Sequence, residues 1–282
     1  MDAWQTMGSA DPVVDPGLSD GTLVLRISYD GTDFSGFAEQ REEDVRTVAG
    51  EVRRALEIFL RRPVELTCAG RTDAGVHAIA QHVSMPIVGS ELEIDRRRWM
   101  RAMGALFPED VALDEVYHAA PGFSARFDAR SRTYTYRIAC GEARPLLTRK
   151  VVWWHRGLLD EAAMEEAAHV LVGEHDFRSF CKAASAEGKS TCRRIQGISF
   201  EHEAQFGEDA LAISITGNAF LHSMVRVIIG SLVEVGARRR DPAWIGDVLA
   251  VRDRRAAGPT APAKGLCLTG VSYDEDALSI CS

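Results

Sequence analysis

The sequence predicts an α+β fold of two similar domains, each a mainly antiparallel sheet with helices packed on one face. Runs that alternate apolar and polar residues, typical of strands, are interleaved with runs of helical period. The first half reads strand, helix, strand, strand, helix, strand, and the second half has a similar mixture without a convincing sequence repeat. We therefore expect domains at residues 21–120 and 121–282, with sheets meeting around a central cleft, after a disordered tail at residues 1–20.

In the first half, the expected strands are 22–29, 63–67, 76–85 and 111–118, and the expected helices are 47–60 and 95–106. The first helix has an apolar stripe, a cap at Thr47 and a stop at Pro63. The arginine run of the second helix is expected to face solvent. Helices on one face of a sheet follow from this order.

In the second half, the expected strands are 131–140, 150–155, 194–203, 210–217 and 266–273, and the expected helices are 160–172, 218–235 and one opening at Asp241-Pro242. Asp160 and Asn218 are the expected N-caps, and Gly173 should end the first of these helices. Residues 174–181 then form a loop whose His175-Asp176 pair fits a proton relay or, more simply, a histidine tied to its neighbours. Residues 182–190 are expected to be mobile.

Composition narrows the class of protein. Of 282 residues, 46% are hydrophobic and 26% charged, which suits a globular fold. No apolar run reaches the roughly 18–20 residues of a membrane span, and the N-terminus lacks a secretory pattern. Six scattered cysteines without metal spacing indicate reduced thiols and a cytoplasmic protein. The net charge is −8, but residues 121–156 hold eight basic residues against two acidic ones, which is either a basic face or a set of solvated arginines.

An acidic residue, Asp73, stands between two of the expected strands in a turn with a glycine on either side. Gly70 and Gly75 can take positive φ and let a backbone or ligand approach closely. Arg71 can offer a bidentate fork to phosphate or carboxylate. From the residues alone, a polar turn and a functional site explain this stretch about equally well.

The run from Gly70 to Ala78, GRTDAGVHA, resembles the signature of the TruA-type tRNA pseudouridine synthases. Five further stretches resemble the same family in order and spacing, at residues 29–32, 125–134, 173–180, 218–226 and 260–266. They span nearly the whole chain after the tail. One departure is Phe37-Ala38, where family members usually carry Trp-Gln, and it concerns local RNA or packing contacts rather than the chemistry.

The resemblance implies an isomerase that turns uridine into pseudouridine in the tRNA anticodon stem-loop, at positions 38 to 40. It implies a homodimer whose partner is tRNA, with no cofactor and no membrane. Asp73 would be the catalytic residue, Arg226 its partner, and Tyr134 the ring that stacks on the target base. Leu266 would lie under the base, unless it is an ordinary core leucine. The arginines expected to contact the substrate are Arg71, Arg126, Arg130 and Arg132.

Three other functions remain open at this stage. A synthase with other RNA targets would carry the same motif, because site choice depends on RNA shape. A non-catalytic RNA-binding or tRNA-folding protein could use the same scaffold, although Asp73, Tyr134 and Arg226 together count against it. An Asp-dependent glycosidic hydrolase would be expected to pair two carboxylates, whereas this motif offers one.

Overall fold

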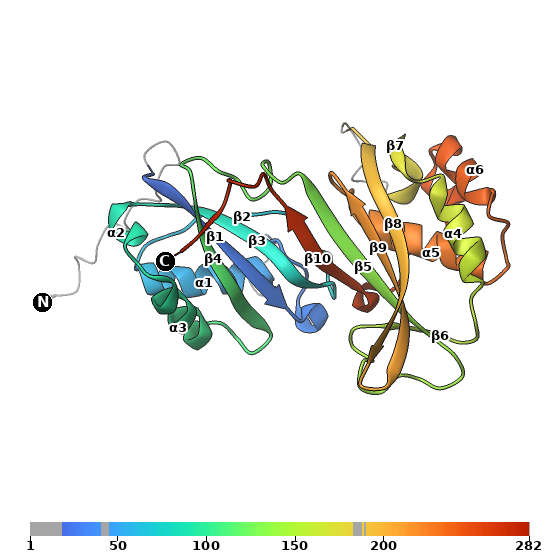
Figure 1. The fold of residues 1–282 in the computed structure, drawn as a ribbon, viewed down its shortest axis with the longest axis horizontal. Coiled ribbons are helices and arrows are strands. Elements are labelled where there is room, and N and C mark those ends of the chain that lie inside the picture. Colours follow the sequence, from blue (N-terminus) through green and yellow to red (C-terminus); the bar gives the residue numbers. More distant parts are fainter. Residues whose placement is uncertain (1–18, 41–44, 183–187, 189, 282) are drawn as a thin grey trace, which may run out of the picture.

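The structure is a computed structural model that describes residues 19–40, 45–182, 188 and 190–281 (Figure 1). The strands are β1 Gly21–Tyr29, β2 Thr67–Cys68, β3 His77–Ile87, β4 Val111–Ala119, β5 Ser131–Cys140, β6 Trp153–His155, β7 Gly173–Asp176, β8 Cys192–Gln205, β9 Glu208–Gly217, β10 Leu266–Ser272 and β11 Ser279–Ile280. The α-helices are α1 Val48–Leu60, α2 Gly89–Leu92, α3 Arg96–Leu106, α4 Glu161–His169, α5 Met224–Gly236 and α6 Trp244–Val251. The expected tail at 1–20 lies almost wholly outside the described residues, as does most of 182–190.

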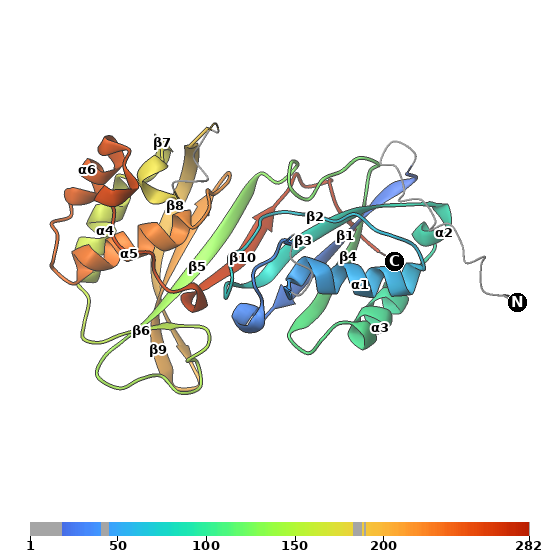
Figure 2. The ribbon, with the colours of Figure 1, turned by 180° about the vertical axis from the view of Figure 1, so that it is seen from behind.

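One sheet runs through both halves of the chain, in the order β11-β4-β1-β3-β10-β5-β9-β8-β7, with β2 beside β3 and β6 beside β5. Most pairs are antiparallel, which confirms an α+β fold with a large, mainly antiparallel sheet. Figure 2 shows α1 and α3 on the same face of this sheet as α5. The two expected sheets are joined into one, and the domain boundary at residue 120 stays a prediction.

The join is made by β10. It pairs with β5 in antiparallel fashion and with β3 in parallel, the latter through Cys267 with His77 and Leu268 with Ala78. The C-terminal β11 then pairs with β4 of the first half. These contacts connect segments far apart in the sequence, so the order of elements along the chain does not reveal them.

The helix-side face of the sheet carries the core. Alternate residues of β1, from Leu23 to Tyr29, are buried against the apolar stripes of α1 and α3. Thr47 Oγ1 accepts a hydrogen bond from the Gly50 amide, which confirms the predicted cap of α1. Each such buried apolar side chain contributes on the order of 1.5–3 kcal/mol, so the sheet forms a stiff base.

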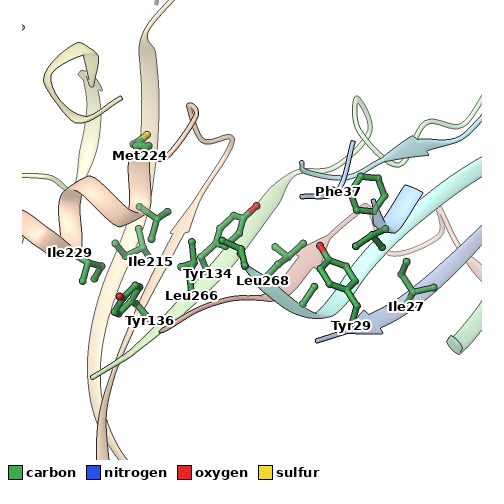
Figure 3. Packing of buried hydrophobic residues seen from close by; sticks show 14 of the residues in the cluster. Ile27, Tyr29, Phe37, Tyr134, Tyr136, Ile215, Met224, Ile229, Leu266 and Leu268 are labelled. Atoms are coloured by element: carbon green, nitrogen blue, oxygen red, sulfur yellow. The ribbon is translucent and has the colours of Figure 1, made fainter. Parts of the chain in front are cut away.

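Helix α5 is buried on nearly all sides, with only Arg226 and Glu234 outside the buried set. A helix that is apolar all round belongs in a core. Figure 3 shows Met224 and Ile229 of α5 beside Ile215 and Tyr136 of the sheet. The helix therefore holds Arg226 in a fixed position.

Two expected strands are shorter than predicted. In the segment 63–67 only Thr67 enters a strand, because Pro63 has no amide hydrogen and the Val64 amide donates to the Glu57 carboxylate. In 150–155 only the last three residues pair, because the Val151 amide closes a turn on Thr148. Local alternation was present in both segments, but these amides had other acceptors.

The helix predicted over 160–172 ends at His169, although Asp160 caps it as expected. Gly173 does not end this helix; it takes a φ of +112° and opens β7. His175 consequently lies on a strand rather than in a loop, with its Nε2 3.1 Å from the Val172 carbonyl oxygen. This contact fits a histidine tied to its neighbours.

The predicted starts of the last two helices were wrong. The residue before α5 is Ser223, whereas the Asn218 side chain accepts from the amides of Arg194 and Ala219. The last helix begins at Trp244, after a turn in which its amide donates to the Asp241 carbonyl. In the described part of the chain, no helix has the length and apolar character needed to cross a membrane.

Candidate active site

A pocket of about 710 Å³ lies where the two halves of the chain meet. Its lining comes from residues 35–40, 68–74 and 76, 126–127, 219–225, Arg132, Tyr134, Arg193 and Leu266. Six of the eight residues predicted for the site therefore line one pocket: Arg71, Asp73, Arg126, Arg132, Tyr134 and Leu266. Arg226 joins the site through its contact with Asp73, and Arg130 is not among the lining residues.

The loop carrying Asp73 connects β2 to β3 and is tied to the rest of the protein at several points. The Phe37 amide donates to the Thr72 carbonyl, and the Gly75 amide donates to the Phe34 carbonyl. The Thr72 hydroxyl lies 2.8 Å from the Tyr29 hydroxyl in a buried hydrogen bond. These bonds hold the loop in place before any substrate binds.

Two glycines permit this arrangement for different reasons. Gly75 has a φ of +77°, which is the positive φ predicted for it from the sequence. Gly70 does not lie in that region, but a Cβ there would come 3.2 Å from the Tyr134 hydroxyl. The prediction was thus correct for Gly75, and close approach rather than positive φ explains Gly70.

The Asp73 carboxylate is held from one side. Its Oδ2 accepts from Ser223 Oγ at 2.8 Å and from Arg226 Nη1 at 2.8 Å. Its Oδ1 lies 3.4 Å from Nε2 of His222, an exposed side chain. Because the Asp73 side chain is 21% exposed, solvent or a ligand in the pocket can reach the carboxylate.

Arg226 is fixed by α5 and by the segment between α6 and β10. Its Nε donates to the Ala261 carbonyl at 2.8 Å, while Nη1 serves Asp73. Ser223 precedes the helix with a φ of +60°, a turn that brings both Ser223 and Arg226 to the same carboxylate oxygen. The arginine expected to need a carboxylate partner in this apolar helix has one.

Tyr134 of β5 and Leu266 of β10 are buried between the two halves (Figure 3). Phe220 meets the Tyr134 ring edge-on, with centroids 5.2 Å apart. Burial, and after it the nearby Cys68 and Asp73, raises the pKa of the Tyr134 phenol, so the ring stays neutral near pH 7. Burial also raises the pKa of the Cys68 thiol to about 11, which leaves that thiol protonated and a poor nucleophile.

The arginines predicted to contact phosphate differ in what they already bind. Arg71 and Arg126 are exposed at the pocket, and Arg126 lies over the Phe127 ring. Arg130 pairs with Asp274 at the surface. The buried Arg132 donates to four backbone carbonyls, those of Ala69, Arg126, Ala129 and Asn218. Arg132 connects these segments of the site through its hydrogen bonds. This geometry does not support the expectation that Arg132 contacts phosphate.

Sequence reasoning did not single out His222, Ser223 or Arg193. The first two lie within the stretch 218–226 that resembled the family, but their contact with Asp73 spans about half the chain. Phe37 is buried beside Tyr29 and Ala38 lines the pocket, so the first contributes packing and the second leaves space. Among the described residues, no group of three or more potential ligands is placed to hold a metal ion.

A family model described as tRNA pseudouridine synthase matches residues 26–128 and 167–274. The chain is 43% identical over 254 residues to tRNA pseudouridine synthase A of Methylococcus capsulatus, covering 90% of each. It is 42% identical over 252 residues to the protein of the same name from Chloroflexus aurantiacus, covering 89% of this chain and 88% of the relative. A solved Cbf5-Nop10-Gar1 complex aligns with a TM-score of 0.39 at 11% identity, over 97% of this chain and 57% of the other, a likeness too weak for any conclusion.

Proposed function

The chain belongs to the tRNA pseudouridine synthase family, and on this premise we propose that it converts uridine to pseudouridine in the anticodon stem-loop of tRNA. The observation that carries the proposal is the Asp73 carboxylate, anchored by Ser223 and Arg226 at the pocket that Tyr134 lines. A partly exposed carboxylate oxygen in a preformed site is what nucleophilic or general-base catalysis requires.

In the proposed reaction, the N1–C1′ bond of the uridine breaks and a C5–C1′ bond forms. The C5 hydrogen leaves as a proton and N1 gains one, so no cofactor or oxidant is needed. We assign the reactive role to Oδ1 of Asp73, because Oδ2 already accepts two hydrogen bonds. Attack on C1′, addition to the base and removal of a sugar proton all begin at this oxygen.

The Tyr134 ring is proposed to stack on the target base. Stacking on an aromatic ring contributes roughly 1–3 kcal/mol and does not specify which edge of the base faces which way. This property suits a base that must detach, rotate and reattach while bound. Leu266 would add an apolar contact, and the pocket volume of about 710 Å³ is ample for a flipped nucleotide.

The partner that these groups favour is tRNA. Arg71 and Arg126 line the pocket without a carboxylate partner among the described residues, so they can contact phosphates even though the net charge is −8. Selection of positions 38 to 40 would come from the shape of the RNA around the flipped base. A homodimer and a cytoplasmic location complete the proposal.

The test is release of tritium from tRNA labelled at uridine C5. We compare the parent protein with Asp73→Asn and with Asp247→Asn, the same chemical change at an exposed residue of α6. Release by the parent and by Asp247→Asn, but not by Asp73→Asn, supports the proposal. Tight tRNA binding without release by the parent would instead indicate an RNA-binding protein or a different RNA target.

A further inference from the structure

We propose that Arg193 binds an RNA phosphate on the side of the pocket opposite Arg71 and Arg126. The inference rests on the proposed function and adds a substrate-binding residue to it. It also narrows the substrate to a uridine within a strand, held through phosphates on both sides of the flipped base. Three features of Arg193 support the inference: its position at the pocket, the fixed orientation of its guanidinium, and its unpaired charge among the described residues.

Arg193 lies on the other half of the sheet from the Asp73 loop. It is the second residue of β8, opposite His175 of β7, and it lines the pocket together with the segment 219–225. Strands β10, β5 and β9 separate β8 from β3, whose preceding loop carries Arg71. Arg71 and Arg193 thus come from different halves of the sheet, so they can approach different parts of a bound strand.

The guanidinium of Arg193 is already oriented. Its Nη1 donates to the Ser190 carbonyl at 3.0 Å and to the Cys192 carbonyl at 2.6 Å. Its Nε is buried without a hydrogen-bond partner. A side chain held in this way loses little rotamer freedom when an anion binds, which lowers the entropic cost of binding.

Among the described residues, no carboxylate balances the charge of Arg193. Both of its acceptors are neutral carbonyls, and no carboxylate of the described residues forms an ion pair with it. The carboxylates that line the pocket are already used, since Asp73 pairs with Arg226 and Glu39 pairs with Arg53. In the part of the chain that the structure describes, Arg71, Arg126 and Arg193 thus leave net positive charge at the pocket of an acidic protein.

The neighbouring residue provides a matched control. Arg194 is exposed and carries the same charge, but successive residues of a strand face opposite sides. It does not line the pocket, and its contacts with the described residues are made by its backbone, which pairs with Glu174 and bonds to Asn218. If general surface charge governed RNA binding, replacing either arginine would have the same effect.

The experiment measures tRNA affinity against salt concentration, with Asp73→Asn as the parent so that no turnover occurs. Arg193→Gln should weaken tRNA binding and reduce the slope of log K against log salt by about 0.9. The ratio between the tRNA affinities of the parent and of this variant should therefore fall about threefold between 50 and 200 mM salt. Arg193→Lys should keep most of the slope. Arg194→Gln should match the parent.

Steady-state kinetics with Asp73 intact give the second readout. Arg193→Gln should raise KM for tRNA with kcat nearly unchanged, because the residue binds the strand and does not touch the reacting atoms. Equal effects of the two Gln variants, or an unchanged salt slope for Arg193→Gln, would overturn the inference. If the unmodified protein releases tritium, the proposed function holds and only the role of Arg193 is overturned. If it does not, the proposed function itself fails.

Discussion

Replacing Arg226 with methionine tests whether the Asp73 carboxylate depends on its partner. The ion pair spans 2.8 Å, and its side chains are only 18% and 21% exposed. Arg226→Met removes this contact and the bond from Nε to the Ala261 carbonyl. The carboxylate then remains in a partly buried site, with a hydrogen bond from Ser223 and with His222 3.4 Å from Oδ1.

The expected magnitude follows from the exposure. Breaking a fully buried ion pair by removing one partner costs about 3–5 kcal/mol of unfolding free energy. Here water reaches about a fifth of each side chain and Ser223 remains, so we expect a loss of about 2–3 kcal/mol. Adding Asp73→Asn to the Arg226→Met variant removes the unpaired carboxylate charge and should restore about 1–2 kcal/mol of unfolding free energy.

The assay is urea unfolding of the parent, both single variants and the double variant. Activity of Arg226→Met should fall about a hundredfold in the tritium-release assay, since a carboxylate displaced by about 1 Å is poorly aligned. Additive effects of the two substitutions on the unfolding free energy would show that the ion pair does not couple them. The account of how Asp73 is held would then be wrong.

Two further perturbations test the scaffold around the site. Burial lowers the pKa of His82 from 6.5 to about 4, so the unfolded chain takes up a proton first as pH falls, and stability present above pH 6.5 is lost towards pH 4. The free energy of unfolding should fall by about 3 kcal/mol over this pH range. In the His82→Gln variant, urea unfolding at the same pH values should not show this fall. Gly31→Ala would place a Cβ 2.0 Å from the Val76 carbonyl oxygen, shift the Asp73 loop, and lower both activity and stability, the latter by about 1–3 kcal/mol. Gly104→Ala, with open space at its Cβ in α3, should be neutral or stabilising, and equal losses in the two alanine variants would contradict this reasoning.

Elements whose signals are local were predicted well. The strand at 131–140 matches β5, and the helix capped by Thr47 matches α1, because alternation and capping depend on residues a few positions apart. The misplaced start of α5 has the same origin. Asn218 is a good capping residue, but its side chain is occupied by the Arg194 amide, a contact 24 residues away in the chain.

The sequence by itself determined most of the long strands and helices, the turn that presents Asp73, and the resemblance from which the chemistry follows. It also indicated that Arg226 needed an acidic partner, because an arginine in an apolar helix is costly to leave unpaired. Only the tertiary structure decided which groups meet. Asp73 lies 150 residues from Ser223 and 153 from Arg226, and β10 joins two halves that sequence order suggested would carry separate sheets. Such contacts depend on how the whole chain packs, and local periodicity carries no information about which distant residues packing brings together.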